Sequence, residues 1–276
     1  METHGKNPRQ SVFAIIPARY SSVRLPGKML LPLAGKPLIL HTVEKAREAA
    51  TVDEVIVATD DQRIFDAVTA DGHRAVMTSR DHPSGSDRIA EAARALPEGS
   101  IVVNVQGDEP VISPATIDRA VTALRSDAAA DIASTFEPIQ SLKELLNGNN
   151  VKVAVGDDGY AVYFSRSPIP WPRKASLRYG GDPNKAINAQ PELLSHFKKH
   201  TGLYVYRREY LLKFSELPRT SLEELEMLEQ LRALETGAKI RMVEAAGRSI
   251  GVDTAEDLEL VRAVIEAEER AHEIVA

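Results

Sequence analysis

The chain contains no cysteine among its 276 residues. Disulfide bonds and thiolate metal sites are therefore excluded, and the absence of cysteine fits a reducing cytoplasm. No window approaches eighteen apolar residues, so we expect no membrane-spanning helix and no membrane partner. The polar N-terminal stretch METHGKNPRQ lacks the apolar segment of a signal peptide. These absences together predict a cytoplasmic location.

The chain also lacks an excess of positive charge, since its formal net charge is −6. This balance argues against general nucleic-acid binding, and any polyanion it binds must meet a local group of cations. Hydrophobic residues make up 43% and charged residues 27% of the chain. These fractions are ordinary for a globular protein that can bury a sizeable core.

The first half of the chain alternates short apolar runs with amphipathic segments. Apolar runs at 11–18, 54–60 and 100–110 read as buried strands, and Ser86 and Ser113 stand where each could cap a following helix. Strands and helices at these intervals are typical of βαβ units. We therefore predict an α/β fold with a mostly parallel, Rossmann-like sheet, whose loops after the strands share one edge.

In the second half of the chain, the regular alternation of strands and helices ends. Two alternating segments around GDDG predict a hairpin at 151–166, and the residues rich in Pro and Gly at 167–194 predict a long loop. The residues 221–237 read as a single amphipathic helix. We expect one domain over residues 11–265, an inserted hairpin and loop subdomain over 150–215, and terminal extensions at 1–10 and 266–276.

A group of cations follows the first strand directly. Arg19, Arg24 and Lys28 lie in the loop after FAIIPA, and Gly27 permits a tight turn there. An Arg fork combined with a Lys point charge suits a triphosphate, although a solvated basic loop remains the alternative. The spacings of the Walker loop and of the Rossmann glycine fingerprint are both absent.

Two acidic motifs are candidates for a metal site. NVQGDEP delivers Asp108 and Glu109 to the same sheet edge, and IGVDTAEDL adds Asp253. Carboxylate oxygens beside a phosphate site suit Mg²⁺. The alternatives are a turn residue before proline for Asp108 and a helix N-cap for Asp253. His196 and His200 in HFKKH have the spacing of a zinc pair, but no third ligand is obvious.

Seven motifs occur in an order that resembles the 3-deoxy-manno-octulosonate (Kdo) cytidylyltransferase family. They are IIPARYSSVRLPGK, HPSGSDR, VNVQGDEP, YFSRSPIP, HTGLYVYR, LEQLRAL and GVDTAEDL. The resemblance spans roughly residues 11–265, and the segment 171–195 is longer than the family's usual connection. It implies the glycosyltransferase A-like fold of sugar nucleotidyltransferases, and a homodimer formed through the hairpin region.

The resemblance also implies a reaction and a role for each site residue. CMP would pass from CTP to the anomeric hydroxyl of Kdo, for lipopolysaccharide biosynthesis, with Mg²⁺ as cofactor. Arg19, Lys28 and Asp108 would be catalytic, and Asp108 and Asp253 would hold the metal. The nucleotide would meet Ala18, Arg19, Lys28, Ser84, Gly85 and Arg88, and the sugar acid would meet Gln106, Arg166, His200, Tyr204, Glu229 and Gln230.

Three alternatives remain open at this point. The first is another acidic sugar, such as the 8-amino analogue of Kdo or a sialic acid, because the pocket residues do not distinguish an amine from a hydroxyl. The second alternative is a nucleotide-binding regulator on the same fold without turnover, against which Lys28, Asp108 and Asp253 argue. The third alternative is a purely structural α/β module, against which the cations and carboxylates gathered at one sheet edge argue.

Overall fold

The computed structural model describes residues 10–21 and 25–275, so that Arg24 and residues 1–9 of the predicted N-terminal extension lie outside it. The strands are β1 Val12–Ala18, β2 Pro32–Leu33, β3 Lys36–Pro37, β4 Glu54–Thr59, β5 Arg74–Met77, β6 Ile101–Asn104, β7 Ile132–Pro138, β8 Lys152–Val155, β9 Ala161–Ser165, β10 Lys198–Arg207 and β11 Ile240–Glu244. The α-helices are α1 Leu38–Arg47, α2 Gln62–Ala70, α3 Gly85–Ala93, α4 Pro114–Ser126, α5 Leu142–Leu146, α6 Arg173–Ser176, α7 Pro183–Ala189, α8 Arg208–Glu216, α9 Ser221–Glu226, α10 Glu229–Glu235 and α11 Ala255–Val275. Short 3-10 helices are η1 Lys28–Leu30, η2 Leu177–Tyr179 and η3 Pro191–His196.

The central sheet has the strand order β11-β7-β10-β6-β1-β4-β5. Strand β1 pairs in parallel with β4 and β6, β4 pairs in parallel with β5, and β11 with β7. Strand β10 runs antiparallel between β6 and β7. The predicted α/β fold with a mostly parallel sheet is confirmed, and β10 is the exception at its centre.

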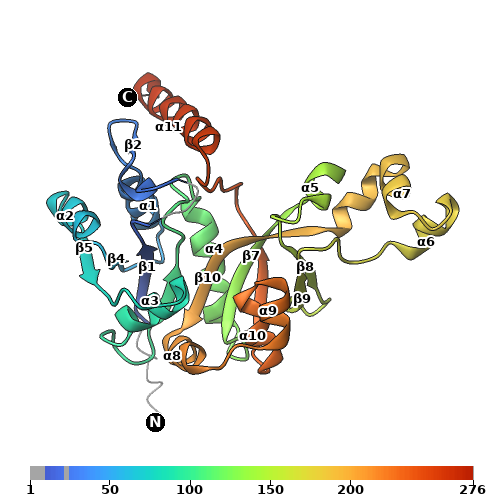
Figure 1. The fold of residues 1–276 in the computed structure, drawn as a ribbon, viewed down its shortest axis with the longest axis horizontal. Coiled ribbons are helices and arrows are strands. Elements are labelled where there is room, and N and C mark those ends of the chain that lie inside the picture. Colours follow the sequence, from blue (N-terminus) through green and yellow to red (C-terminus); the bar gives the residue numbers. More distant parts are fainter. Residues whose placement is uncertain (1–9, 22–24, 276) are drawn as a thin grey trace, which may run out of the picture.

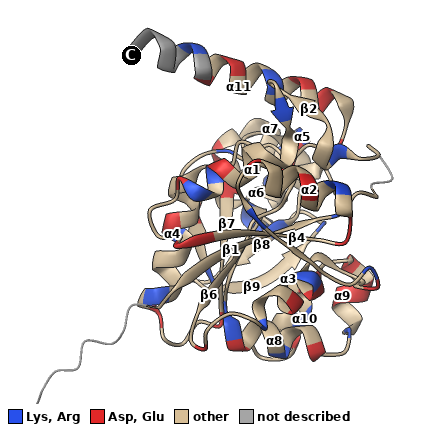
Figure 2. Ribbon diagram, turned by 90° about the vertical axis from the view of Figure 1, so that its left-hand side faces the viewer, with Lys and Arg blue, Asp and Glu red and all other residues tan. Residues whose placement is uncertain are grey.

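Helices cover both faces of this sheet (Figures 1 and 2). Alternate residues of β1 divide between the faces: Val12, Ala14 and Ile16 pack with α1, α4 and α11, whereas Ile15 packs with α3, α8 and α10. This two-sided burial explains why β1 reads as one continuous apolar run. Of the helices in the described residues, none is both long and apolar enough to cross a membrane.

Residues 139–197 form an arm that projects from the sheet (Figure 1). The predicted hairpin is confirmed, since β8 and β9 pair antiparallel. The predicted long loop at 167–194 is wrong, because short helices occupy most of it. Pro183 starts α7 behind an N-cap, Asp182, that accepts a hydrogen bond from the Asn184 amide. Strand β10, which lies within the predicted subdomain of 150–215, belongs to the central sheet.

The prediction of one helix over 221–237 is also wrong. Met227 adopts a left-handed conformation with φ 53°, which separates α9 from α10. No Gly or Pro marks this break, so its cause is tertiary. The break turns Glu226 toward the hairpin, where Glu226 accepts a hydrogen bond from Ser165, and it turns Glu229 toward α3.

Candidate active site

A lysine and two aspartates meet at the edge of the sheet. The Lys28 ammonium donates to Asp108 Oδ2 at 2.5 Å, to Asp253 Oδ1 at 3.1 Å and to the Val252 carbonyl at 3.0 Å. Burial alone would lower the pKa of Lys28, but the charges of the two aspartates and their hydrogen bonds outweigh it, and the pKa is raised. The ammonium is therefore charged, and three oxygen atoms converge on one cation.

Three distant segments deliver these groups. Lys28 opens η1 after Gly27, whose φ is 68° and whose added Cβ would lie 3.1 Å from Tyr20 Oη, so a side chain there would be strained. Asp108 follows β6, and the Val252 amide donates to the Asp108 carbonyl at 2.8 Å. The N-cap interpretation of Asp253 is wrong, since Thr254 Oγ1 accepts from the Asp257 amide at the start of α11.

A first cleft of about 550 Å³ contains two of the predicted cations, Arg19 and Lys28. The Arg19 guanidinium donates to the carbonyls of His82 and Ser84, at 2.6 and 3.0 Å, and so holds the start of α3 against β1. Ser84 is the N-cap of α3 in place of the predicted Ser86. The cleft is lined by Pro17, Arg19, Ser21, Lys28, Met29, Pro83, Ser84, Gly85, Gln106, Glu229 and Asp253.

Arg88 and Ala18 do not line this cleft with their side chains. Arg88 is fully buried, and it donates to Asp60 at 2.9 Å and to the Thr78 hydroxyl. It therefore supports the loop ends after β4 and β5 and does not reach a nucleotide directly, contrary to expectation. The Ala18 side chain is likewise buried at the end of β1, so only its backbone could meet a ligand.

A second cleft of about 720 Å³ adjoins the first, and Asp253 lines both. The second cleft gathers Arg166, His200, Tyr204 and Gln230 as predicted. Gln106 and Glu229, which were expected with them, line the first cleft instead. The Glu229 carboxylate accepts from Ser86 at 2.7 Å, because α10 begins beside α3.

Arg166 has an unusual set of partners for a cation. Its guanidinium donates to the backbone carbonyls of Glu226, Gly148 and Met227, at 2.8, 3.0 and 3.4 Å. Among the described side chains, no carboxylate forms an ion pair with it. The positive charge of Arg166 is thus oriented by carbonyls while it remains available to an anion in the cleft.

His200 is a neutral, packed member of the second cleft. Its Nε2 lies 2.8 Å from Ser134 Oγ, and its ring centroid is 4.9 Å from Phe164 and 5.2 Å from Tyr204. Desolvation lowers the pKa of His200 to about 3. His196 belongs to η3 in the arm, so the two histidines lie on separate elements and the structure offers no support for a zinc pair.

Another possible group of metal ligands lies near the amino ends of β4 and β5. Glu44, Asp71 and His73 bring one ligand atom each within 4.8 Å of the others. Lys36 already pairs with Glu44, and Arg47 Nη1 lies 2.9 Å from His73 Nδ1. Because Arg47 can only donate, the proton of His73 is on Nε2, which leaves no ring nitrogen free for a metal.

Several residues of the second cleft had no local signal in the sequence. The Lys199 ammonium lies 2.7 Å from Glu137, and Ser249 contacts both Glu137 and Glu109. Desolvation raises the pKa of Glu109 to about 7. These contacts join residues more than sixty positions apart, so only the fold reveals them. Glu109 was expected at this sheet edge together with Asp108, and it lines the second cleft.

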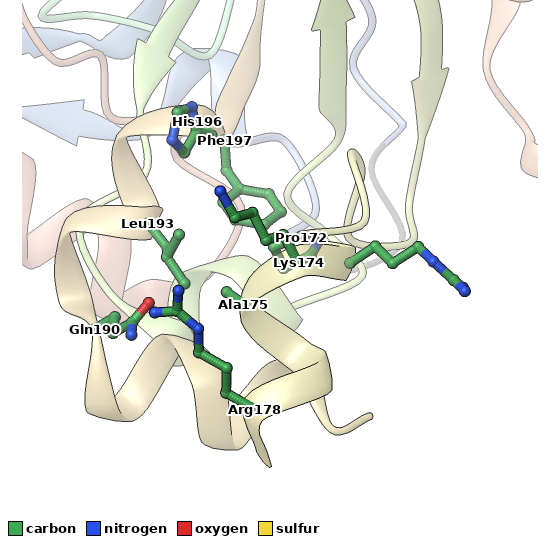
Figure 3. Close-up of a pocket in the computed structure, with 9 residues that line it drawn as sticks. Pro172, Lys174, Ala175, Arg178, Gln190, Leu193, His196 and Phe197 are labelled. Carbon is green, nitrogen blue, oxygen red and sulfur yellow. The ribbon is translucent and has the colours of Figure 1, made fainter. Parts of the chain in front are cut away.

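A separate pocket of about 450 Å³ lies in the arm (Figure 3). Its lining combines Phe197 and Leu193 with Lys174, Arg178 and His196, and none of the described residues that line it is acidic. None of the residues expected to meet the nucleotide, the sugar acid or Mg²⁺ lines it. The extra segment at 171–195 therefore forms a cationic pocket of its own and does not line either cleft.

The class of protein follows from a comparison with known families. The family described as cytidylyltransferase matches residues 13–240. A 3-deoxy-manno-octulosonate cytidylyltransferase from Geobacter sulfurreducens is 49% identical over 91% of this chain and 98% of its own. One from Nitrosococcus oceani is 46% identical over 94% of this chain and 98% of its own. The chain therefore belongs to the 3-deoxy-manno-octulosonate cytidylyltransferase family.

A solved structure agrees in fold over nearly the whole chain. It is described as CMP:2-keto-3-deoxy-manno-octonic acid synthetase complexed with CTP. The two are 42% identical with a TM-score of 0.83, covering 94% of this chain and 100% of the other. The elements that bring Lys28, Asp108 and Asp253 together thus belong to a shared architecture.

Proposed function

We propose that this chain transfers CMP from CTP to the anomeric hydroxyl of 3-deoxy-manno-octulosonate and releases pyrophosphate. The observation that carries the proposal is the position of Asp253, which lines both a cationic cleft and a second cleft that contains the guanidinium of Arg166. A nucleotide in the first cleft and an acidic sugar in the second would meet at this residue. The names of the relatives support the same two substrates.

The first cleft suits the triphosphate. Arg19 and Lys28 supply fixed positive charge, and the amino end of α3 at Ser84 and Gly85 offers backbone N–H groups to an anion. During transfer, negative charge builds up on the α-phosphate oxygens and on the departing pyrophosphate. Lys28 lines this cleft, and its ammonium can stabilise the developing charge.

Asp108 and Asp253 fit a magnesium ion. Their oxygens and the Val252 carbonyl already converge on one cation, the Lys28 ammonium, and hard oxygen ligands are those that Mg²⁺ prefers. Bound Mg²⁺ would supply neutralisation of phosphate charge and acidification of the sugar hydroxyl. In its presence Lys28 would turn from the aspartates to the phosphates.

The second cleft suits a sugar acid. The guanidinium of Arg166 has no carboxylate partner among the described side chains and would bind the carboxylate of the sugar. The anomeric oxygen then forms a bond to the α-phosphorus while the bond from that phosphorus to the bridging oxygen of pyrophosphate breaks. The hydroxyl proton leaves to solvent, and we assign no general base.

The homodimer and the cytoplasmic location stay predictions. Exposed apolar side chains on the arm support a subunit contact there: Val162 is 65%, Trp171 61% and Leu177 64% exposed. All three belong to the arm, and exposed apolar side chains that form a patch are typical of an interface. The mass of the particle in solution by light scattering tests the dimer, and a monomer at all concentrations would reject it.

Pyrophosphate release tests the reaction. The protein is incubated with CTP and Mg²⁺, and with Kdo, its 8-amino analogue or a sialic acid offered separately. We expect fastest release with Kdo. Faster release with the amino sugar would change the assigned sugar substrate but not the proposed reaction. No release with any sugar would favour the nucleotide-binding regulator instead.

A further inference from the structure

Ser249 joins two acidic side chains beside the proposed metal site. It lies in the segment 245–254, which connects β11 to α11 and carries Asp253. The Ser249 hydroxyl donates to Glu109 Oε2 at 2.9 Å, and its amide donates to Glu137 Oε1 at 3.1 Å. One residue thus connects the loop after β6, strand β7 and the segment before α11.

The hydrogen bond from Ser249 to Glu109 connects the two loops that carry Asp108 and Asp253. Glu109 follows Asp108 directly, and Ser249 precedes Asp253 by four residues. A second hydrogen bond between these two loops runs from the Val252 amide to the Asp108 carbonyl at 2.8 Å. These two hydrogen bonds between the loops therefore determine the distance between the carboxylates of Asp108 and Asp253.

The bond to Glu137 fixes this arrangement to the sheet. Glu137 is a residue of β7, is 3% exposed, and pairs with Lys199 at 2.7 Å. Glu109 and Glu137 are like charges, and Ser249 is the residue that donates to both. Loss of its hydroxyl would leave Glu109 without this donor in a largely desolvated position, which costs free energy until the loop moves.

We propose that Ser249 is a positioning residue for the metal site: its two hydrogen bonds set the separation of Asp108 and Asp253. The inference rests on the proposed function and assigns to Ser249 a role that neither the motifs nor the relatives' names indicate. Ser249 acts through Glu109 and does not itself touch substrate. Partners of this kind typically change metal affinity by 10- to 100-fold.

Metal binding without turnover tests the proposal. Binding of Mn²⁺ to the full-length protein is measured by electron paramagnetic resonance for wild type, Ser249→Ala and Ser249→Thr. Ser126→Ala is the matched control, since Ser126 is exposed on α4 and donates only to the Ala123 carbonyl. We expect about 10-fold weaker Mn²⁺ binding for Ser249→Ala, recovery in Ser249→Thr, and no change in the control.

Turnover provides the second readout. The Mg²⁺ concentration for half-maximal activity should rise for Ser249→Ala while KM for CTP stays unchanged, since a merely destabilised fold would alter both. Glu109→Ala removes the same hydrogen bond from the other side and should reproduce the effect, even if Ser249→Ala folds poorly. Wild-type Mn²⁺ affinity in both variants overturns the inference. Absence of Mn²⁺ binding in wild type overturns the metal assignment itself and the inference with it, whereas pyrophosphate release tests the reaction separately.

Discussion

The edge of the central sheet and the arm are held together in different ways. At the edge, polar contacts join residues that are far apart in the chain: Lys28 contacts the Val252 carbonyl 224 positions away. The helices of the arm pack around a small local core of Ile139, Leu145, Ile187 and Phe197, whereas its hairpin joins the large core of the sheet. None of the described residues that line the arm pocket is acidic. The contrast teaches that chemistry is concentrated where distant segments are fixed against each other.

Removal of one carboxylate charge at the sheet edge should have the largest effect on turnover. Asp108→Asn keeps the shape of the side chain but loses an anion that pairs with Lys28 and would bind the metal. We expect turnover to fall on the order of 10³-fold, as measured by pyrophosphate release. Asp66→Asn, an exposed change on α2, is the control. Near-normal turnover in Asp108→Asn would reject its catalytic role.

Lys28→Met should separate catalysis from metal binding. We expect kcat to fall on the order of 10²-fold because the transition-state charge loses a fixed cation. Binding of Mn²⁺ without nucleotide should become tighter, since the ammonium no longer competes for Asp108 and Asp253. Lys213→Met on the surface of α8 provides the comparison. A change confined to KM would mean that Lys28 acts only in ground-state binding.

Arg166→Lys tests the cleft where the arm meets the sheet. The substitution keeps the positive charge but loses the planar fork that three carbonyls orient. We expect KM for the sugar acid to rise about 10-fold, the value of one charge-assisted hydrogen bond, with KM for CTP unchanged. Arg219→Lys in an exposed position is the control. An equal rise in both KM values would contradict a role specific to the sugar.

His200, in the second cleft, should make the free energy of unfolding depend on pH. Its pKa of about 3 in the folded state lies below the ordinary value of 6.5, so the unfolded chain binds this proton more readily. The stability that neutral His200 contributes is therefore complete above pH 6.5 and declines as the pH falls toward 3. The difference in unfolding free energy between wild type and His200→Gln should narrow between pH 6.5 and 4. A constant difference over this range would show that the folded histidine titrates normally.

The smallest effect is expected in the arm. Lys174→Ala combined with Arg178→Ala removes two exposed cations of the arm pocket. We expect kcat to stay at the wild-type value and the free energy of unfolding to change by no more than about 0.5 kcal/mol. A clear loss of turnover would show that the arm pocket takes part in the reaction.

The sequence predicts the parallel half of the molecule well because its signals are local. Continuous apolar runs identify β1, β4 and β6, and the loops that follow them contain Arg19, Lys28 and Asp108, which meet as expected at one edge. A parallel sheet brings the carboxyl ends of its strands together whatever lies between them. Asp253 could be proposed only from its motif, because it reaches the edge from the far end of the chain.

The errors arise where tertiary contacts override local preference. Nothing in the sequence marks the left-handed Met227, yet this break moves Glu229 from the second cleft to the first. Arg88 was expected to meet the nucleotide, but it is buried and pairs with Asp60. The proline-rich segment at 167–194 reads as a loop, although Pro183 and Pro191 stand at helix starts.

The arm contains the only tryptophan of the chain, Trp171, whose side chain is 61% exposed. Tryptophan emission from this protein consequently originates at one point, outside both clefts. A blue shift on concentration would report that another surface covers the arm, without any label. If CTP or a sugar acid changes the emission spectrum, binding in the clefts alters the environment of Trp171 in the arm.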